Sequence, residues 1–414
     1  MPSPRTLQKL AALALAAALA ASPALATPKS AELARSHLYN DTLAEGAKAL
    51  AAADTADADA RFGLGIVQFT HAVEHLGQNL HRYGLRPPKM ISVPLLRLPV
   101  PPNPSPEELT YDGFRAVLQD FADDLAVAEA ALAKVGDGKT EIVLDLAKIR
   151  MDITGKAKHG GGETMAALLK RMGDRNSTDA PASLEVKFDT GDAAWLRGYC
   201  HVLMALSQFV LAHDFHTTFD TSFQLFFPRT VSPFRAALAL PMPRDTIAGE
   251  WRDAPHFADF VSFIHTMNWP VADAARMKAV RAHLKSVVAA SRESWKLILA
   301  ETGDDREWLP NPRQTHAALG EKISQPQLDS WFGVLDEAEA ILDGRKLVPH
   351  WRFAKGMDFK RFFEEPQTFD LVMLLAGSGA VPYLADGELT TKERWDELTR
   401  AFEGSFFGYA IWIN

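Results

Sequence analysis

The chain has 414 residues, of which 23% are charged and 47% hydrophobic, and its formal net charge is −8 at pH 7. This composition is typical of a globular protein and excludes a largely disordered chain. The acidic balance, without clusters of Lys and Arg, argues against nucleic acid or an anionic membrane as the main partner. We therefore expect no nucleic-acid partner and look for a small molecule or another protein.

The first 26 residues have the features of a cleavable signal peptide. Arg5 and Lys9 supply positive charge, residues 10–21 are Leu and Ala only, and residues 24–26 offer small side chains for cleavage. This apolar run is shorter than the roughly 20 residues that a membrane-spanning helix needs. We predict cleavage after Ala26, no membrane anchor in the processed chain, and export to the periplasm or the medium; an uncleaved anchor is the alternative.

Hydrophobic periodicity predicts a mainly α protein, an irregular multi-helix domain with few short strands. A helix-dominated α+β fold is the alternative. Residues 57–85 place apolar side chains at steps of three and four, as an amphipathic helix does. Eight prolines follow between residues 87 and 106, which predicts an extended connection. We therefore expect an N-terminal helical segment with this connection, residues 27–104, and a main helical domain, residues 105–414; the two can also form one continuous unit.

The rest of the chain shows further helices without a fixed repeat period. Ser105 and Glu108 form a candidate capping box for a helix through residue 132, and Thr390 and Glu393 form another near the C-terminus. A helix that is apolar nearly all round covers residues 192–213 and is expected at the centre of the core. Other helices are predicted over residues 271–302 and 328–343, strands near residues 142–144 and 183–188, and a strand or core-inserted tail over residues 406–413.

Residues 152–163 resemble an EF-hand calcium loop in part. With Asp152 at the first position, Thr154 falls at the third and Glu163 at the twelfth, where the loop supplies oxygen ligands. Residues 142–151 and 165–172 are candidates for the two flanking helices. Lys156 stands where a ligand belongs and Ala157 where the turn asks for Gly, so the loop is a degenerate one. Its candidate metal ligands are Asp152, Thr154 and Glu163, with calcium as the candidate ion; a Gly-rich surface loop without a cofactor is the alternative.

Two histidine groups are candidates for a transition metal. His71, Glu74 and His75 match the H-x-x-E-H pattern of inverted zinc proteases, in which two histidines bind zinc and the glutamate activates water. Both histidines fall on the polar face of the predicted helix, where a solvated helix surface is the other interpretation. His213, His216 and Asp220 offer a two-histidine-plus-carboxylate set, although a histidine at a helix C-terminus is also favoured by the helix dipole.

Other reactive groups give no catalytic signature. Cys200 is the single cysteine and lies in an apolar segment, so we expect a buried and inert thiol. The sequence contains no G-x-S-x-G elbow and no Walker-type phosphate loop. Trp308 and Trp351 lie in Pro-flanked connections and are candidates for lining a groove. These features favour an exported helical protein that binds a ligand or a partner; the alternative is a metal-dependent hydrolase that uses one of the histidine groups.

Overall fold

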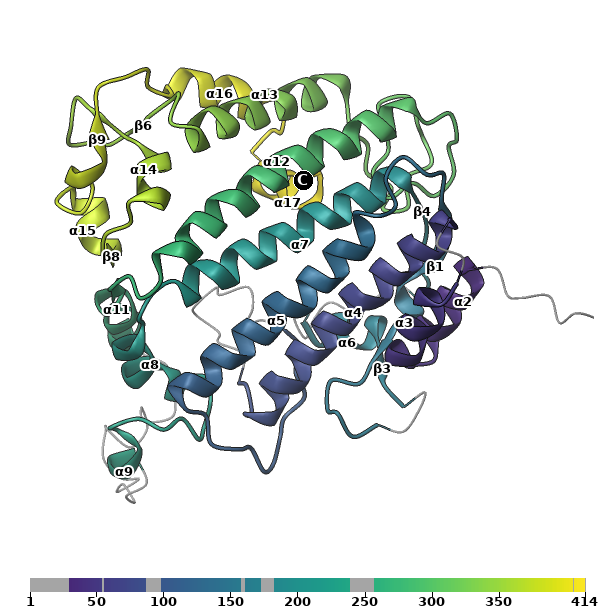
Figure 1. Ribbon diagram of the computed structural model, residues 1–414, viewed down its shortest axis with the longest axis horizontal. Coiled ribbons are helices and arrows are strands. Elements are labelled where there is room, and N and C mark those ends of the chain that lie inside the picture. The colour runs from purple at the N-terminus through teal and green to yellow at the C-terminus, as the bar shows by residue number, and fades with distance from the viewer. Residues whose placement is uncertain are drawn as a thin grey trace, which may run out of the picture.

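The computed structural model describes residues 30–53, 56–86, 98–157, 161–172, 182–238, 257–404 and 406–413. It confirms a mainly α protein with a few short antiparallel strands (Figure 1). The predicted signal peptide, residues 1–26, and residues 87–97 of the Pro-rich connection lie outside the described residues. No helix in the described part of the chain is both long and apolar enough to cross a membrane.

Four long helices pack side by side and form the body of the protein (Figure 1). In spatial order they are α4 (Ala58–Arg82), α5 (Tyr111–Leu132), α7 (Thr190–Leu211) and α12 (Ala274–Ala300). Each begins at a residue whose side chain accepts a hydrogen bond from the first turn: Asp57, Thr110, Asp189 and Asp273, respectively. Two short helices, α2 (Ser30–Tyr39) and α3 (Leu43–Ala51), pack against α4.

The remaining helices lie around this body. They are α6 (Met165–Met172), α8 (His216–Ser222), α9 (Arg235–Leu238), α11 (Phe257–His265), α13 (Gln325–Leu342), α14 (Phe359–Glu364), α15 (Leu371–Ala376), α16 (Lys392–Arg400) and α17 (Phe406–Ile413). Short 3₁₀ turns cover Leu146–Lys148, Phe223–Leu225 and Val381–Tyr383.

The strands form small antiparallel sheets. The longest pair joins β1 (Glu141–Asp145) to β4 (Glu185–Asp189), with Ile142 opposite Phe188. The others are β2 (Arg150–Met151) with β3 (Glu163–Thr164), β5 (Asn268–Trp269) with β8 (Phe369–Asp370), and β7 (Gly356–Met357) between β6 (Val348–Pro349) and β9 (Leu384–Ala385). The two strands expected near residues 142–144 and 183–188 are therefore confirmed, and the structure shows that they pair with each other.

The predicted capping box at Ser105 and Glu108 is wrong, because α5 begins only at Tyr111. The preceding backbone is tied to a distant segment: the N–H of Leu109 donates to the Arg229 carbonyl, and the N–H of Val231 donates to the Leu109 carbonyl. Glu108 accepts hydrogen bonds from the Arg229 and Arg235 side chains instead of closing a helix turn. Tertiary pairing thus holds this stretch extended.

The C-terminal helices also differ from expectation. The first helical residue of α16 is Lys392, and its cap is Thr391 rather than Thr390. Residues 406–413 form helix α17 and not a strand. Ile413 is completely buried, whereas Phe407 and Ile411 are 80% and 67% exposed, so the expected core-inserted tail is limited to the end of the segment. A helix satisfies its backbone groups internally, whereas a single strand at this place would need a neighbouring strand.

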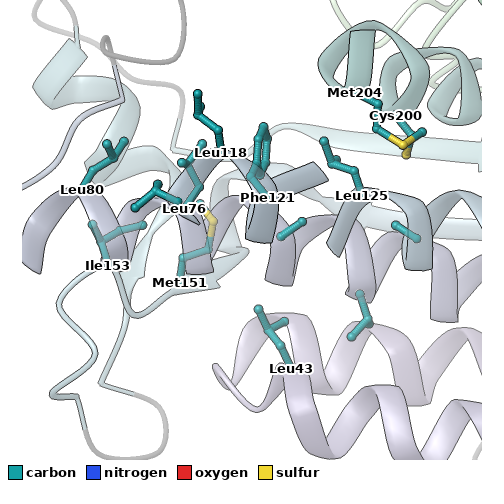
Figure 2. Packing of buried hydrophobic residues seen from close by; sticks show 14 of the residues in the cluster. Leu43, Leu76, Leu80, Leu118, Phe121, Leu125, Met151, Ile153, Cys200 and Met204 are labelled. Atoms are coloured by element: carbon teal, nitrogen blue, oxygen red, sulfur yellow. The ribbon is translucent and has the colours of Figure 1, made fainter. Parts of the chain in front are cut away.

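The largest group of buried apolar side chains joins the two segments proposed from the sequence. It includes Leu76 on α4 and Phe121 on α5, which lie on facing sides of the two helices (Figure 2). Cys200 and Met204 on α7 belong to the same group. Cys200 has no exposed surface, and burial raises the pKa of its thiol to about 12, which confirms the expected inert thiol.

Close approach of α4 and α5 depends on Gly65. A Cβ at this position would lie 2.4 Å from Cδ2 of Leu132. We expect Gly65→Ala to lower the free energy of unfolding by roughly 1–3 kcal/mol, because extra volume in a packed core forces strain. Gly408 on α17 is the control, since a Cβ at that position would have no atom within 4 Å and Gly408→Ala should be neutral or slightly stabilising. Urea denaturation of both variants tests this; equal stabilities would contradict the close approach.

Candidate functional site

A mostly apolar cavity of about 570 Å³ opens between α4, α7 and α17. Pockets of roughly 300–1,000 Å³ with apolar walls and few polar groups are typical binding sites for small molecules. Helix α4 contributes Phe62, Ile66, Phe69 and Thr70, and the β1 region contributes Leu144, Leu146 and Ile149. The size and chemistry of this cavity make it the candidate functional site.

Helix α7 presents one face to the cavity. Asp192, Trp195, Leu196 and Tyr199 are spaced by three, four and seven residues, so they lie along one side of the helix. Asp192 is also the third residue of the capping box: its carboxylate accepts the Asp189 N–H at 2.9 Å. Burial alone raises the pKa of Tyr199 to about 12. Asp192 and Tyr199 thus place a carboxyl and a hydroxyl in a mostly apolar wall.

The opposite wall is built by α17 and held by two indoles. Ile411 and Trp412 line the cavity. Nε1 of Trp195 donates to the Trp412 carbonyl at 2.9 Å, and Nε1 of Trp295 donates to the Ile413 carbonyl at 3.1 Å. These bonds satisfy carbonyls at the C-terminal end of α17, which have no partner within the helix. The position of the cavity wall therefore depends on α7 and α12.

Trp308 completes an aromatic group around the cavity, as expected from its place in a connection. Its ring lies 5.4 Å from Trp195 in an edge-to-face arrangement and 5.9 Å from Phe188, while Trp195 lies 4.6 Å from Tyr199. Trp351 does not share this role: its side chain is 75% exposed, and its Nε1 donates to the Leu375 carbonyl.

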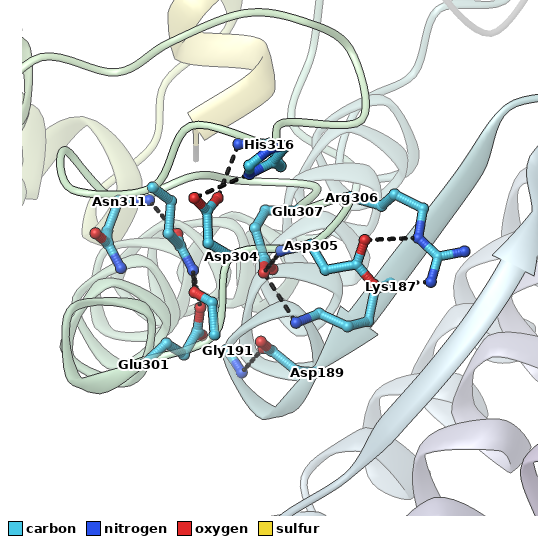
Figure 3. Close-up of polar contacts among 12 residues, drawn as sticks. Lys187, Asp189, Gly191, Glu301, Asp304, Asp305, Arg306, Glu307, Asn311 and His316 are labelled. Carbon is cyan, nitrogen blue, oxygen red and sulfur yellow. Dashed lines mark hydrogen bonds and ion pairs between the residues drawn. The ribbon is translucent and has the colours of Figure 1, made fainter.

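An acidic cluster adjoins the cavity at the start of α7. It consists of Asp189, Asp192, Glu301 and Glu307, and Figure 3 shows Glu301 and Glu307 approaching the start of α7. Oxygen atoms of Asp189, Glu301 and Glu307 lie within 4.8 Å of one another. One ammonium group offsets them, since Nζ of Lys187 lies 2.9 Å from Oε1 of Glu307.

Burial and mutual repulsion change the protonation of this cluster. Burial raises the pKa of Glu301 to about 9, and the charge of Asp189 adds to the shift. Burial also raises the pKa of Asp192 well above its usual range, again with a contribution from Asp189. Burial is thus the main cause of both shifts, and repulsion by Asp189 adds to it.

No protein-family model, curated protein or solved structure matches this chain. The chemistry of the cavity and its neighbours is therefore the basis for inferring what the protein does. The shape and lining of the cavity are those of a site that binds a small molecule.

The calcium-like loop is formed by strand, loop and strand, so the prediction of two flanking helices is wrong for residues 142–151. The start of this segment, with the β-branched residues Ile142 and Val143, belongs to β1 and pairs with β4. Residues 165–172 do form a helix. Oδ1 of Asp152 accepts hydrogen bonds from the Thr154 N–H and hydroxyl, and Oδ2 accepts one from the Ala157 N–H. Glu163 lies in β3, opposite Met151. Both carboxylate oxygens of Asp152 thus accept hydrogen bonds from within the loop. Calcium binding by Asp152, Thr154 and Glu163 stays a prediction.

The H-x-x-E-H residues lie beside a second cavity, of about 630 Å³, which Asp41, His71, Glu74 and Asp152 help to line. Glu74 is 8% exposed and accepts the Asp152 N–H at 2.6 Å, and burial raises its pKa to about 8. His75 is directed to α5, where its Nδ1 lies 2.7 Å from an oxygen of Asp124. The structure therefore gives Glu74 and His75 different partners.

The second histidine group is also divided. His213 has no exposed surface, and its Nδ1 lies 2.7 Å from the Phe209 carbonyl. His216 stacks on the Tyr111 ring at 4.4 Å, and its side chain is 57% exposed, 3.7 Å from Asp220. Within the described ranges, Asp189, Glu301 and Glu307 form the one group of histidine, cysteine or acidic side chains close enough to share a metal. Neither histidine group meets that requirement.

The residues that matter most at the cavity were not singled out from the sequence, except Trp308. Asp189-Thr190-Gly191-Asp192 does carry the pattern of a capping box before an apolar helix, so the Asp189 and Asp192 positions were accessible to sequence reasoning. Glu301 and Glu307 carry no such signal. Gly191 allows the end of α12 to approach, because a Cβ there would lie 2.6 Å from Cγ1 of Ile298 and 3.2 Å from Oε1 of Glu301.

Proposed function

We propose that this protein binds an apolar small molecule in the cavity between α4, α7 and α17. The observation that carries the proposal is the cavity itself, 570 Å³ in volume and walled by aromatic and aliphatic side chains. Such a wall contributes binding free energy in proportion to the apolar surface that the ligand removes from water. Together with the expected signal peptide, the proposal describes an exported ligand-binding protein of the periplasm or medium.

The aromatic group supports the proposal through its rigidity. Trp195 is fixed by its hydrogen bond to the Trp412 carbonyl and by edge-to-face contact with Trp308. Rings that are already ordered lose little conformational entropy when a ligand arrives. The aromatic wall of the cavity is therefore preorganised for binding.

Narrowing the cavity is the direct test. Leu319 lines it and is 42% exposed, so Leu319→Trp adds bulk without overpacking the buried core. Titration calorimetry with decanol, a neutral apolar probe, should show binding to the wild type and an affinity at least about tenfold lower in Leu319→Trp, a loss of about 1.4 kcal/mol.

Leu375→Trp is the matched control, because Leu375 is 62% exposed on α15 and does not line the cavity. It should bind decanol as the wild type does. No heat of binding in the wild type, or equal losses in both variants, would reject the cavity as the binding site.

The metal-dependent hydrolase is supported less well, because Glu74 and His75 have different partners. Glu74 is the residue on which it would depend as a general base, and Glu74 instead accepts a backbone N–H. Elemental analysis of the purified protein separates the two proposals: stoichiometric zinc or iron that Glu74→Gln retains while hydrolase activity is lost would favour the hydrolase.

Calcium binding by the loop at Asp152 has a separate test. A melting temperature of the protein that rises when calcium is added would support it.

A further inference from the structure

The charged groups around the cavity restrict its ligand. Among the described residues that line the cavity, Asp192 is the one residue with an ionisable acidic or basic side chain other than Tyr199, and none is Lys, Arg or His. A ligand carboxylate or phosphate would find no counter-charge in this wall and would lose its hydration. Asp192 is 4% exposed, so its carboxyl is screened from bulk water.

Further carboxyl groups lie close to Asp192. Oxygen atoms of Asp189, Glu301 and Glu307 lie within 4.8 Å of one another, these residues interact electrostatically with Asp192, and Lys187 is paired with Glu307. Because Glu301 keeps its proton at neutral pH, Asp189 and Glu307 with the one ammonium of Lys187 leave one net negative charge next to the cavity. Coulomb interactions at partly buried sites are several times stronger than in water.

The aromatic side chains favour the same ligand charge. Trp195, Tyr199 and Trp308 surround this part of the cavity with ring centroids 4.6 and 5.4 Å apart. The faces of indole and phenol rings attract ammonium groups, and this attraction grows when water is excluded. A carboxyl beside several aromatic rings is a combination suited to an organic cation.

We infer that the ligand of this cavity is an organic amine, with an apolar body against α4 and α17 and an ammonium group directed to Asp192. This inference rests on the proposed function and adds the ligand's charge to it. An alkylammonium, like the lysine side chain, remains protonated at neutral pH.

The test compares decylamine, decanol and decanoate, which share an apolar chain and differ in the charge of one end. Calorimetric titration of the full chain at neutral pH, below the micelle concentration of each compound, should rank the amine first and the carboxylate last. We expect an affinity at least about tenfold higher for the amine than for the carboxylate.

Asp192→Asn tests whether Asp192 causes the preference for decylamine. Asparagine keeps an oxygen that can accept the Asp189 N–H, so the start of α7 is preserved. This variant should bind decylamine about tenfold more weakly and decanol within about twofold of the wild type. Asp396→Asn, which makes the same substitution on the surface of α16, should leave all three affinities unchanged.

The outcomes distinguish the inference from the proposed function. Equal affinities for amine and alcohol, or an amine preference that survives in Asp192→Asn, would overturn the inference while decanol binding still supports an apolar site. Tightest binding of decanoate would also overturn it. Failure of all three compounds to bind the wild type would overturn the proposed function and the inference together.

Discussion

Lys187→Met is expected to lower the free energy of unfolding by about 3–5 kcal/mol, because it removes one partner of a buried ion pair. The Lys187 side chain is 11% exposed and that of Glu307 is 3% exposed, with 2.9 Å between the charged atoms. Without the ammonium group, Glu307 stays buried next to Asp189 and Glu301 with no cation to offset it. Urea denaturation measured by circular dichroism gives the change.

Two further variants show whether burial is the cause. Lys148 also pairs with a buried carboxylate, Asp145, at 3.0 Å, but its side chain is 59% exposed, so Lys148→Met should cost less than about 1 kcal/mol. Adding Glu307→Gln to Lys187→Met should recover part of the lost stability, because the unpaired charge is removed. If Lys187→Met and Lys148→Met had the same small effect, the ion pair would contribute no more than a surface pair.

The second large effect is a fall in stability as the pH rises. The pKa of Glu301 is raised by burial from its ordinary 4.5 to about 9, and that of Glu74 to about 8. Between the ordinary and the raised value, the folded protein holds a proton that the unfolded chain has released, so raising the pH favours unfolding. The stabilisation is complete below about pH 4.5 and is lost as the pH passes the folded-state values.

Denaturation at about pH 6 and about pH 9 should therefore differ by on the order of 2 kcal/mol, after discounting for the partial exposure of Glu301. Glu301→Gln cannot lose a proton and should reduce this difference, and Glu74→Gln should reduce it independently. A wild-type protein that became more stable between these pH values would contradict the protonation of both carboxyls.

The helices could be predicted from the sequence where their signals were local. The stripe of apolar residues in 57–85 corresponds to α4, and the apolar segment 192–213 corresponds to α7 at the centre of the body. The beginning of α5 could not be predicted in the same way, since the pairing of Leu109 with residues 229–231 overrides the cap at Ser105. Boundaries fail where distant residues compete for the same backbone groups.

The candidate site was less accessible, because its residues come from separate parts of the chain. Phe62, Phe188, Trp195, Trp308 and Trp412 meet at one cavity, and each alone looks like an ordinary core residue. The patterns that did stand out, such as His71-x-x-Glu74-His75, owe their spacing to one helix. A short motif of this kind fixes the order of residues but not the direction of their side chains.

The hydrogen bond between Trp195 and the Trp412 carbonyl joins residues 217 positions apart, and the bond from Trp295 to Ile413 spans 118. Contacts of such long range raise the contact order, which slows folding. The cavity is thus closed by one of the least locally anchored pieces of the molecule, while α4, α5 and α7 share a core that does not need α17. Local undocking of α17 would therefore open an exit for a bound molecule while the rest of the protein stays folded.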